Sequence, residues 1–232
     1  MLDVLKSGLK NTFSTTGLEL IGAFYVLNIL GQMINDSLVA QSVLPMPSTG
    51  VQTPLAVTSV PSSVWGVLLL VALVANIWLA IGTLRNLVNR NFDSLDREMF
   101  TQDLGMTALN MIAGSIVFSV AVVLGLLALI VPGLFLMVSL LFWSIFVAVE
   151  GDSFIDALKK SWELATGNRI DLFLIGLGAI GIGLLASLVM AVPNVLLSTV
   201  NPAASALLSL LMSSFGTVLG LVTLAEAYNE LQ

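Results

Sequence analysis

Four amide side chains fall within stretches of the sequence that could span a membrane, where a polar group is best placed for chemistry inside a bilayer: Asn28, Gln32, Asn76 and Asn110. An amide carries both donors and acceptors, so amides on facing helices could line a path for a small solute or an ion. Amides also hydrogen-bond between packed helices, usually for about 1 kcal/mol or less, and this structural role is the commoner one. The pattern therefore predicts packing bonds first and a permeation path as the alternative.

Four carboxylates stand at the ends of these uncharged stretches: Glu19, Glu150, Asp171 and Glu226. Together they could ring a vestibule and attract cations. The plainer interpretation is that they are solvated helix ends, paired with Arg or Lys where the geometry allows. Asp171 and Glu19 each begin a stretch, where a carboxylate complements the helix dipole without any further function.

Much of enzyme chemistry is excluded because the sequence contains no His and no Cys. These residues supply the commonest zinc and copper ligands, the thiol nucleophiles and the imidazole bases. The four acids of residues 93–103 could hold a divalent cation. Arg90 and Arg97 are interleaved with them, which favours a solvated helix face with local ion pairs. We therefore expect no catalytic residue, no metal and no cofactor.

The composition is that of a membrane protein. Of the 232 residues, 57% are apolar and 9% are charged, against roughly 25% charged in a soluble domain. The mean hydropathy is +1.03. The net charge of −6 has the wrong sign for binding nucleic acid or anionic lipid headgroups. Membrane lipid is therefore an expected partner, and nucleic acid is not.

Uncharged intervals predict an all-α bundle with six membrane spans in a single domain, because a charge near the bilayer centre costs a few kcal/mol or more. The expected spans are residues 18–34, 64–84, 104–131, 134–149, 170–192 and 203–225. Pro132 and Gly133 predict the turn of a helical hairpin. A Pro-, Ser- and Thr-rich segment predicts an exposed loop before the second span. Pro193 and Pro202 are expected to bracket a short loop before the sixth.

The positions of Lys and Arg predict the orientation of the spans. All eight fall before the first span, between the second and third, or between the fourth and fifth, so they share one face of the bundle. By the positive-inside rule that face is cytoplasmic. We expect a multi-pass protein of the cell membrane with both termini in the cytoplasm.

Two segments outside the spans, residues 2–13 and 153–166, have the apolar periodicity of amphipathic helices. We expect both to lie on the inner surface of the membrane. Ser153, with Asp156 three residues later, fits an N-terminal cap, and Gly167 stands where a C-terminal cap belongs. Trp162 is expected to anchor its helix at the interface.

Small residues at four-residue spacing mark faces on which helices could pack closely, among them Gly183, Gly216 and Gly220. The same spacing serves contacts within one bundle and contacts between copies of a chain. Packing within the chain is favoured, and a homo-oligomer stays open.

Two motifs carry a family resemblance: IVPG at residues 130–133, and ALKKSWELATG at residues 157–167, preceded by Glu150. Through them the chain from Leu129 onward resembles uncharacterised prokaryotic, especially archaeal, six-span membrane proteins. That family is similar to the membrane domain fused to some glycerophosphoryl diester phosphodiesterases. The resemblance implies an integral archaeal membrane protein. It lends no catalytic role, because the chemistry of the fused relatives belongs to a separate soluble domain.

We expect a non-enzymatic scaffold or partner-binding subunit, because two surface helices and a mixed acidic and basic loop are placed for contact. The partner would be another membrane protein or a second copy of the chain. The alternative is a small-solute or ion transporter or channel, for which Asn28, Asn76 and the interrupted hairpin are the motivation.

Overall fold

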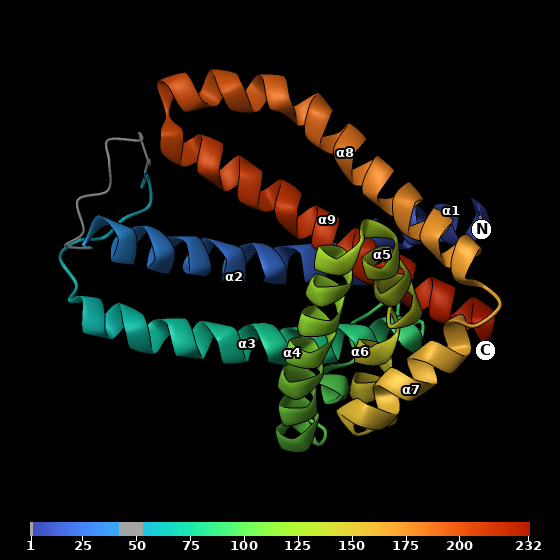
Figure 1. The fold of residues 1–232 in the computed structure, drawn as a ribbon. Helices are drawn as coiled ribbons and strands as arrows, with labels where there is room; N and C mark the ends of the chain where they lie inside the picture. The colour runs from blue at the N-terminus through green and yellow to red at the C-terminus, as the bar shows by residue number, and fades with distance from the viewer. Residues whose placement is uncertain (1, 42–52) are drawn as a thin grey trace. The chain divides into compact units, whose positions relative to one another are not determined.

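A computed structural model describes residues 2–41 and 53–232, and this part of the chain forms helices and turns without a strand. The elements in chain order are α1 Leu2–Thr12, α2 Thr15–Ala40, α3 Ser62–Val88, η1 Arg97–Phe100, α4 Leu104–Ala128, α5 Ile130–Ser139, α6 Trp143–Ile145, η2 Phe146–Glu150, α7 Phe154–Ala165, α8 Arg169–Val200 and α9 Pro202–Leu231 (Figure 1). Within the described residues, six helical segments are long and apolar enough to cross a membrane: α2, α3, α4, residues 130–150, α8 and α9. The predicted all-α class is confirmed.

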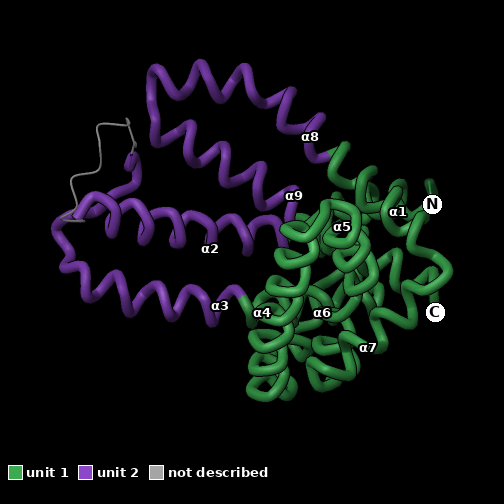
Figure 2. Tube along the Cα trace, viewed as in Figure 1, with its two compact units in different colours: residues 1–19, 77–182, 218–232 green, residues 20–76, 183–217 purple. Residues whose placement is uncertain are grey.

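The chain divides into two compact units (Figure 2). Unit 1 comprises residues 1–19, 77–182 and 218–232, and unit 2 comprises residues 20–76 and 183–217. The four longest helices, α2, α3, α8 and α9, contribute residues to both units. The elements α1 and α4 to α7 belong wholly to unit 1.

The turn between α4 and α5 is at Leu129, so the predicted turn at Pro132 and Gly133 is wrong. Leu129 has an extended backbone, and its N–H donates to the Gly125 carbonyl at 3.0 Å. Pro132 lies in the first turn of α5, where a helix has no bond for the missing N–H to make. Gly133 is buried on α5, and a Cβ added to Gly125 would lie 2.9 Å from its Cα. The two glycines let the hairpin helices approach closely.

The fourth expected span, residues 134–149, is a chain of three helical pieces that ends in the π-helix η2. Between α5 and α6, two backbone groups hydrogen-bond to a side chain of α7. Ser161 Oγ accepts from the Phe142 N–H at 3.0 Å and lies 3.3 Å from the Ser139 carbonyl, to which it donates. Ser161 is buried with Ala157 and Ala165, and small side chains at this four-residue spacing let α7 lie close to its neighbours.

The expected loop at residues 193–202 is also wrong, because α8 continues through Pro193 to Val200. Only Asn201 separates it from α9. Asn201 Oδ1 accepts from the Ala204 N–H at 3.1 Å, and Pro202 takes the first helical position, which suits proline. A separate loop is not needed, because Asn201 caps the helix that Pro202 begins.

The helices α2 and α3 continue past the C-terminal ends predicted for the first two spans. The prediction ended each span before a charged residue, and the structure buries both of these residues within the helices. Asp36, in α2, is 2% exposed. Its Oδ1 accepts from Gln32 at 2.7 Å and its Oδ2 from the Leu55 N–H at 3.1 Å. The bond from Leu55, with that from the Val57 N–H to Ser37 Oγ, attaches the segment before α3 to α2. Residues 42–52 of the expected loop lie outside the described part of the chain.

Arg85, in α3, is the second buried charge and is 8% exposed. Its Nε donates to the Ala148 carbonyl and its Nη1 to the Gln102 carbonyl, both at 2.6 Å. The neighbouring Asn86 exchanges two hydrogen bonds with the backbone of Asp96. These two side chains fix the connection between α3 and α4 and the end of η2.

The two expected surface segments form helices, α1 and α7, within one residue of the predicted bounds. The predicted caps of α7 are confirmed. Ser153 Oγ accepts from the Asp156 N–H at 3.3 Å, and Gly167 has a φ of +93° just beyond the helix. The hydrogen bond between Ser153 and the Asp156 carboxylate lowers the pKa of Asp156.

Candidate acidic pocket

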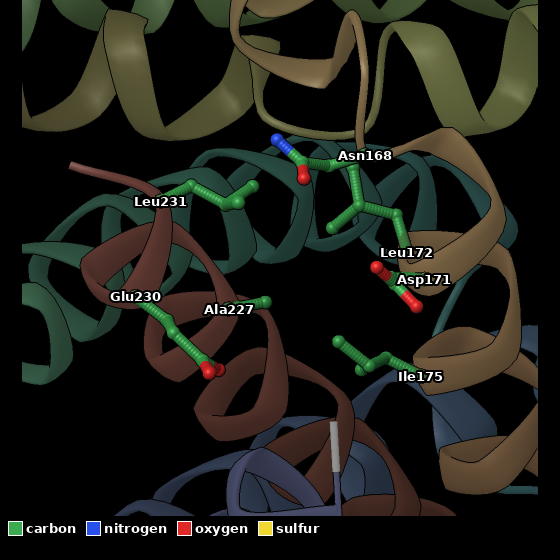
Figure 3. A pocket seen from close by; sticks show the side chains of 7 residues that line it. All are labelled: Asn168, Asp171, Leu172, Ile175, Ala227, Glu230 and Leu231. Atoms are coloured by element: carbon green, nitrogen blue, oxygen red, sulfur yellow. The ribbon is translucent and has the colours of Figure 1, made fainter.

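A pocket of about 260 Å³ lies in unit 1 between the first turns of α8 and the last turns of α9. Its lining residues are Asn168, Asp171, Leu172, Ile175, Ala227, Glu230 and Leu231 (Figure 3). Leu172 and Ala227 are each 2% exposed, whereas Asp171 and Glu230 are exposed to solvent. The pocket therefore combines a hydrocarbon wall with two carboxylates and one amide.

The polar side of the pocket is built by the start of α8. The left-handed backbone of Gly167 turns the chain out of α7. Asn168 follows as the residue before the helix, and its carbonyl accepts the Leu172 N–H at 2.9 Å. Asp171 lies in the first helical turn, where its negative charge complements the helix dipole.

The two pocket carboxylates, Asp171 and Glu230, form no ion pair with any described residue. Arg169 lies only two positions before Asp171, but its guanidinium is stacked on aromatic rings. Its Cζ is 4.5 Å from the ring centre of Phe135 and 4.8 Å from that of Trp162. Such cation–π contacts hold a cation by electrostatic attraction to the ring face. The lining of the pocket therefore keeps a net negative charge.

A polar network holds the last turn of α9. Lys160 Nζ lies 2.7 Å from Glu150 Oε2 and 2.6 Å from Asp152 Oδ2. Tyr228 donates its hydroxyl to Glu150 Oε1 at 2.7 Å, and Gln232 donates to the Tyr228 oxygen at 2.6 Å. The hydrogen bonds of Lys160 raise its pKa above the ordinary value, and the bond to Asp152 has a larger effect than the bond to Glu150. The network ties α7 and the end of η2 to the helix that carries Glu230.

The four amides singled out by the sequence each bond to a separate structural partner. The partners are Ser214 for Asn28 (2.9 Å), Asp36 for Gln32 (2.7 Å), the Ala72 carbonyl for Asn76 (2.9 Å) and the Phe154 N–H for Asn110 (3.2 Å). The bond of Asn28 joins α2 to α9, and that of Asn110 completes the start of α7. Asn76 bonds only to its own helix. These are the bonds of packing groups.

The four carboxylates singled out by the sequence all lie in unit 1, but Asp171 is the only one of them that lines the pocket. Glu150 bonds to Lys160 and Tyr228, and Glu226 accepts a hydrogen bond from Asn11 at 2.7 Å. Glu19 forms no ion pair with a described residue. The other acid that lines the pocket is Glu230, which the sequence analysis missed. Glu226 and Glu230 are four residues apart on α9, and extending the last span from residue 225 to the observed end of the helix would have included both.

The three glycines favoured as packing contacts within the chain are not such contacts in the described residues, so that part of the prediction is wrong, and contact between copies of the chain stays a prediction. A Cβ added to Gly183, Gly216 or Gly220 would meet no atom of the described residues within 4 Å. Close approaches occur at other glycines. A Cβ on Gly178 would lie 2.6 Å from a methyl group of Leu5. Spacing identifies a face of small residues, but not whether another helix covers that face.

One protein family matches almost the entire sequence. Its model is described as Domain of unknown function (DUF7847) and matches residues 1–231. The chain belongs to this family. The DUF7847 match includes residues of both units and every element of the fold. No curated protein and no solved structure matches the chain.

Proposed function

We propose that this DUF7847 chain is a non-enzymatic membrane scaffold that binds a partner protein through unit 1. The observation that carries the proposal is the acidic pocket, whose two exposed carboxylates have no cationic partner in the described chain. A docking surface uses unpaired charge of this kind to steer and select its partner.

The orientation of unit 1 is part of the proposal. All eight Lys and Arg residues belong to unit 1, so the positive-inside rule assigns its aqueous surface, with both termini, to the cytoplasmic side of the cell membrane. Single cysteines at Ser94 and Ser59 test this in a chain without native thiols. Only Ser94→Cys should react with a thiol reagent from the cytoplasmic side, and only Ser59→Cys from the outside. Labelling of both from one side would contradict the orientation.

The helices α1 and α7 are proposed to be amphipathic surface helices that add to the docking area. On α7, Ile155 and Trp162 are 51% and 39% exposed, as expected of side chains that contact lipid or a partner. Trp162 is proposed to anchor α7 at the interface. The motifs at residues 130–133 and 157–167 support an archaeal source and kinship with the membrane domain of glycerophosphoryl diester phosphodiesterases.

A transport function has less support, because the amides that motivated it are engaged in local bonds. Asn28 bonds to Ser214, and Asn76 to its own helix. Scaffold function is tested by extracting the tagged chain from native membranes in mild detergent. We expect a complex larger than the 24.5 kDa chain, which contains a second protein or a second copy. A solitary monomer under these conditions would contradict the proposal.

A further inference from the structure

We propose that the pocket between α8 and α9 receives the side chain of a lysine presented by the partner protein. This inference rests on the proposed function, which supplies the partner. It adds the chemistry by which that partner is recognised, namely an ammonium group on a hydrocarbon stem.

The charge of the pocket selects a cation. Asp171 and Glu230 come from different helices and both line the pocket (Figure 3). Neither has an ion-pair partner among the described residues. Arg169, the basic residue closest to Asp171 in the sequence, is stacked on Phe135 and Trp162. A cation supplied from outside would therefore find two carboxylates free to accept its hydrogen bonds, and charged hydrogen bonds of this kind are stronger than neutral ones.

The wall of the pocket selects the kind of cation. Leu172, Ile175, Ala227 and Leu231 provide hydrocarbon against which an aliphatic stem can lie, as lysine stems do on apolar surface. The ammonium has three donors, and the pocket offers three acceptor side chains, the two carboxylates and the amide oxygen of Asn168. No group of three His, Cys, Asp or Glu suited to a metal occurs among the described residues. A hydrated metal ion would also leave the apolar wall unused.

The test uses the full chain in lipid nanodiscs and two fluorescent peptides, Gly-Ser-X-Ser-Gly, capped at both ends. X is lysine in one peptide and norleucine in the other, which keeps the stem and removes the ammonium. Fluorescence anisotropy measures binding. We expect the lysine peptide to bind at least about tenfold more tightly than the norleucine peptide, as charged hydrogen bonds require.

Two double variants then locate the binding. Asp171→Asn with Glu230→Gln should weaken the lysine peptide by about tenfold or more. Asp93→Asn with Glu98→Gln changes the net charge equally at exposed positions outside the pocket and should leave binding unchanged. Equal binding of both peptides, or equal losses in both double variants, would overturn the inference. Binding of Ca²⁺ at the pocket without preference for the lysine peptide would do the same.

These outcomes are distinct from failure of the proposed function. If the chain forms a complex in native membranes but shows no lysine preference, the scaffold function stands and the lysine pocket is overturned. If the chain binds the lysine peptide through Asp171 and Glu230 but is a solitary monomer in mild detergent, the ligand class of the pocket stands and the scaffold function is overturned.

Discussion

Units 1 and 2 differ most in how they handle polar groups. Unit 1 contains all eight basic residues and thirteen of the fourteen acids, whereas Asp36 is the only charged residue of unit 2. Unit 1 also contains the irregular backbone at residues 89–103 and 140–150. Away from water, every break in a helix frees backbone groups that need a partner. In unit 1 the partners are buried side chains such as Arg85, Asn86 and Ser161.

This difference indicates that the stability of unit 1 depends on single polar side chains, whereas that of unit 2 depends mainly on continuous apolar helices. Asp36 is the exception in unit 2, where a non-helical segment returns to α2. The following predictions test this comparison by unfolding variants in detergent micelles.

Arg85→Met should have the largest effect. The change leaves the carbonyls of Ala148 and Gln102 without their donor, and we expect a loss of about 3 kcal/mol in the free energy of unfolding. Arg97→Met, at an exposed position, is the control and should stay within about 0.5 kcal/mol of the parent. Chemical denaturation measures both. Equal effects would remove the special role of buried Arg85.

Gly133→Ala should destabilise the α4–α5 hairpin by about 2 kcal/mol, because the new methyl group would overlap Leu126. The matched substitution in unit 2 is Gly216→Ala, where the methyl group meets no atom within 4 Å in the part of the chain that the structure describes. It should be neutral or raise stability by up to about 1 kcal/mol through helix propensity. Thermal unfolding curves of the two variants compare the units directly, and a larger loss at Gly216 would reverse the comparison.

Asp36→Asn should cost about 1 to 2 kcal/mol, since one of two buried acceptor oxygens becomes a donor facing Gln32 or the Leu55 N–H. Asn35→Ala, at an exposed neighbouring position, should have little effect. Proteolysis between α2 and α3 should also become faster in Asp36→Asn alone. Unchanged proteolysis would show that Asp36 does not hold this segment.

The bond between Asn28 and Ser214 should contribute about 0.6 kcal/mol, the average for such bonds within membranes. A double-mutant cycle with Asn28→Ala and Ser214→Ala measures this coupling energy. The cycle of Asn76→Ala with Ser214→Ala should show none, because Asn76 bonds to its own helix. A coupling energy of several kcal/mol between Asn28 and Ser214 would show that the stability of unit 2 also depends on single polar side chains.

The smallest effect concerns pH at the start of α7. The pKa of Asp156 is lowered in the folded chain from its ordinary value of 3.8, so its contribution to stability is complete above that value. The contribution is lost as the pH falls through the folded pKa. Lys160 has a raised pKa, so its contribution is complete below 10.5 and is lost at higher pH. Asp156→Asn should flatten the acid limb of stability against pH and leave the alkaline limb unchanged.

Several features of the fold could be predicted because they depend on local sequence. Charge-free stretches predicted the six apolar segments, and Ser153 with Asp156 predicted the start of α7. The prolines misled, because Pro132 suits the first turn of α5 and Pro193 is tolerated inside α8. A proline marks a missing donor, but whether the chain turns there depends on the partners available to the freed carbonyls.

The candidate pocket could be predicted only in part. Asp171 was identifiable as an acid at a span end, but Glu230 lies 59 positions later and meets the same cavity only because α8 and α9 fold against each other. The glycine faces failed for a related reason. Gly216 was predicted to be a packing contact and has no described neighbour within 4 Å, whereas Gly133 was predicted to be a turn residue and lies against Leu126. Only the position of a neighbouring helix decides which glycine is a contact.

The sequence by itself determined that the long helices are apolar enough for a lipid environment, where these helices lie in the chain, and that the charged residues gather in one part of it. Those follow from the free energy of each residue in hydrocarbon or water, which needs no knowledge of neighbours. Tertiary structure alone decided which polar groups are satisfied and which stay open. A hydrogen bond or a cavity requires two segments within a few ångströms, and that proximity is a property of packing.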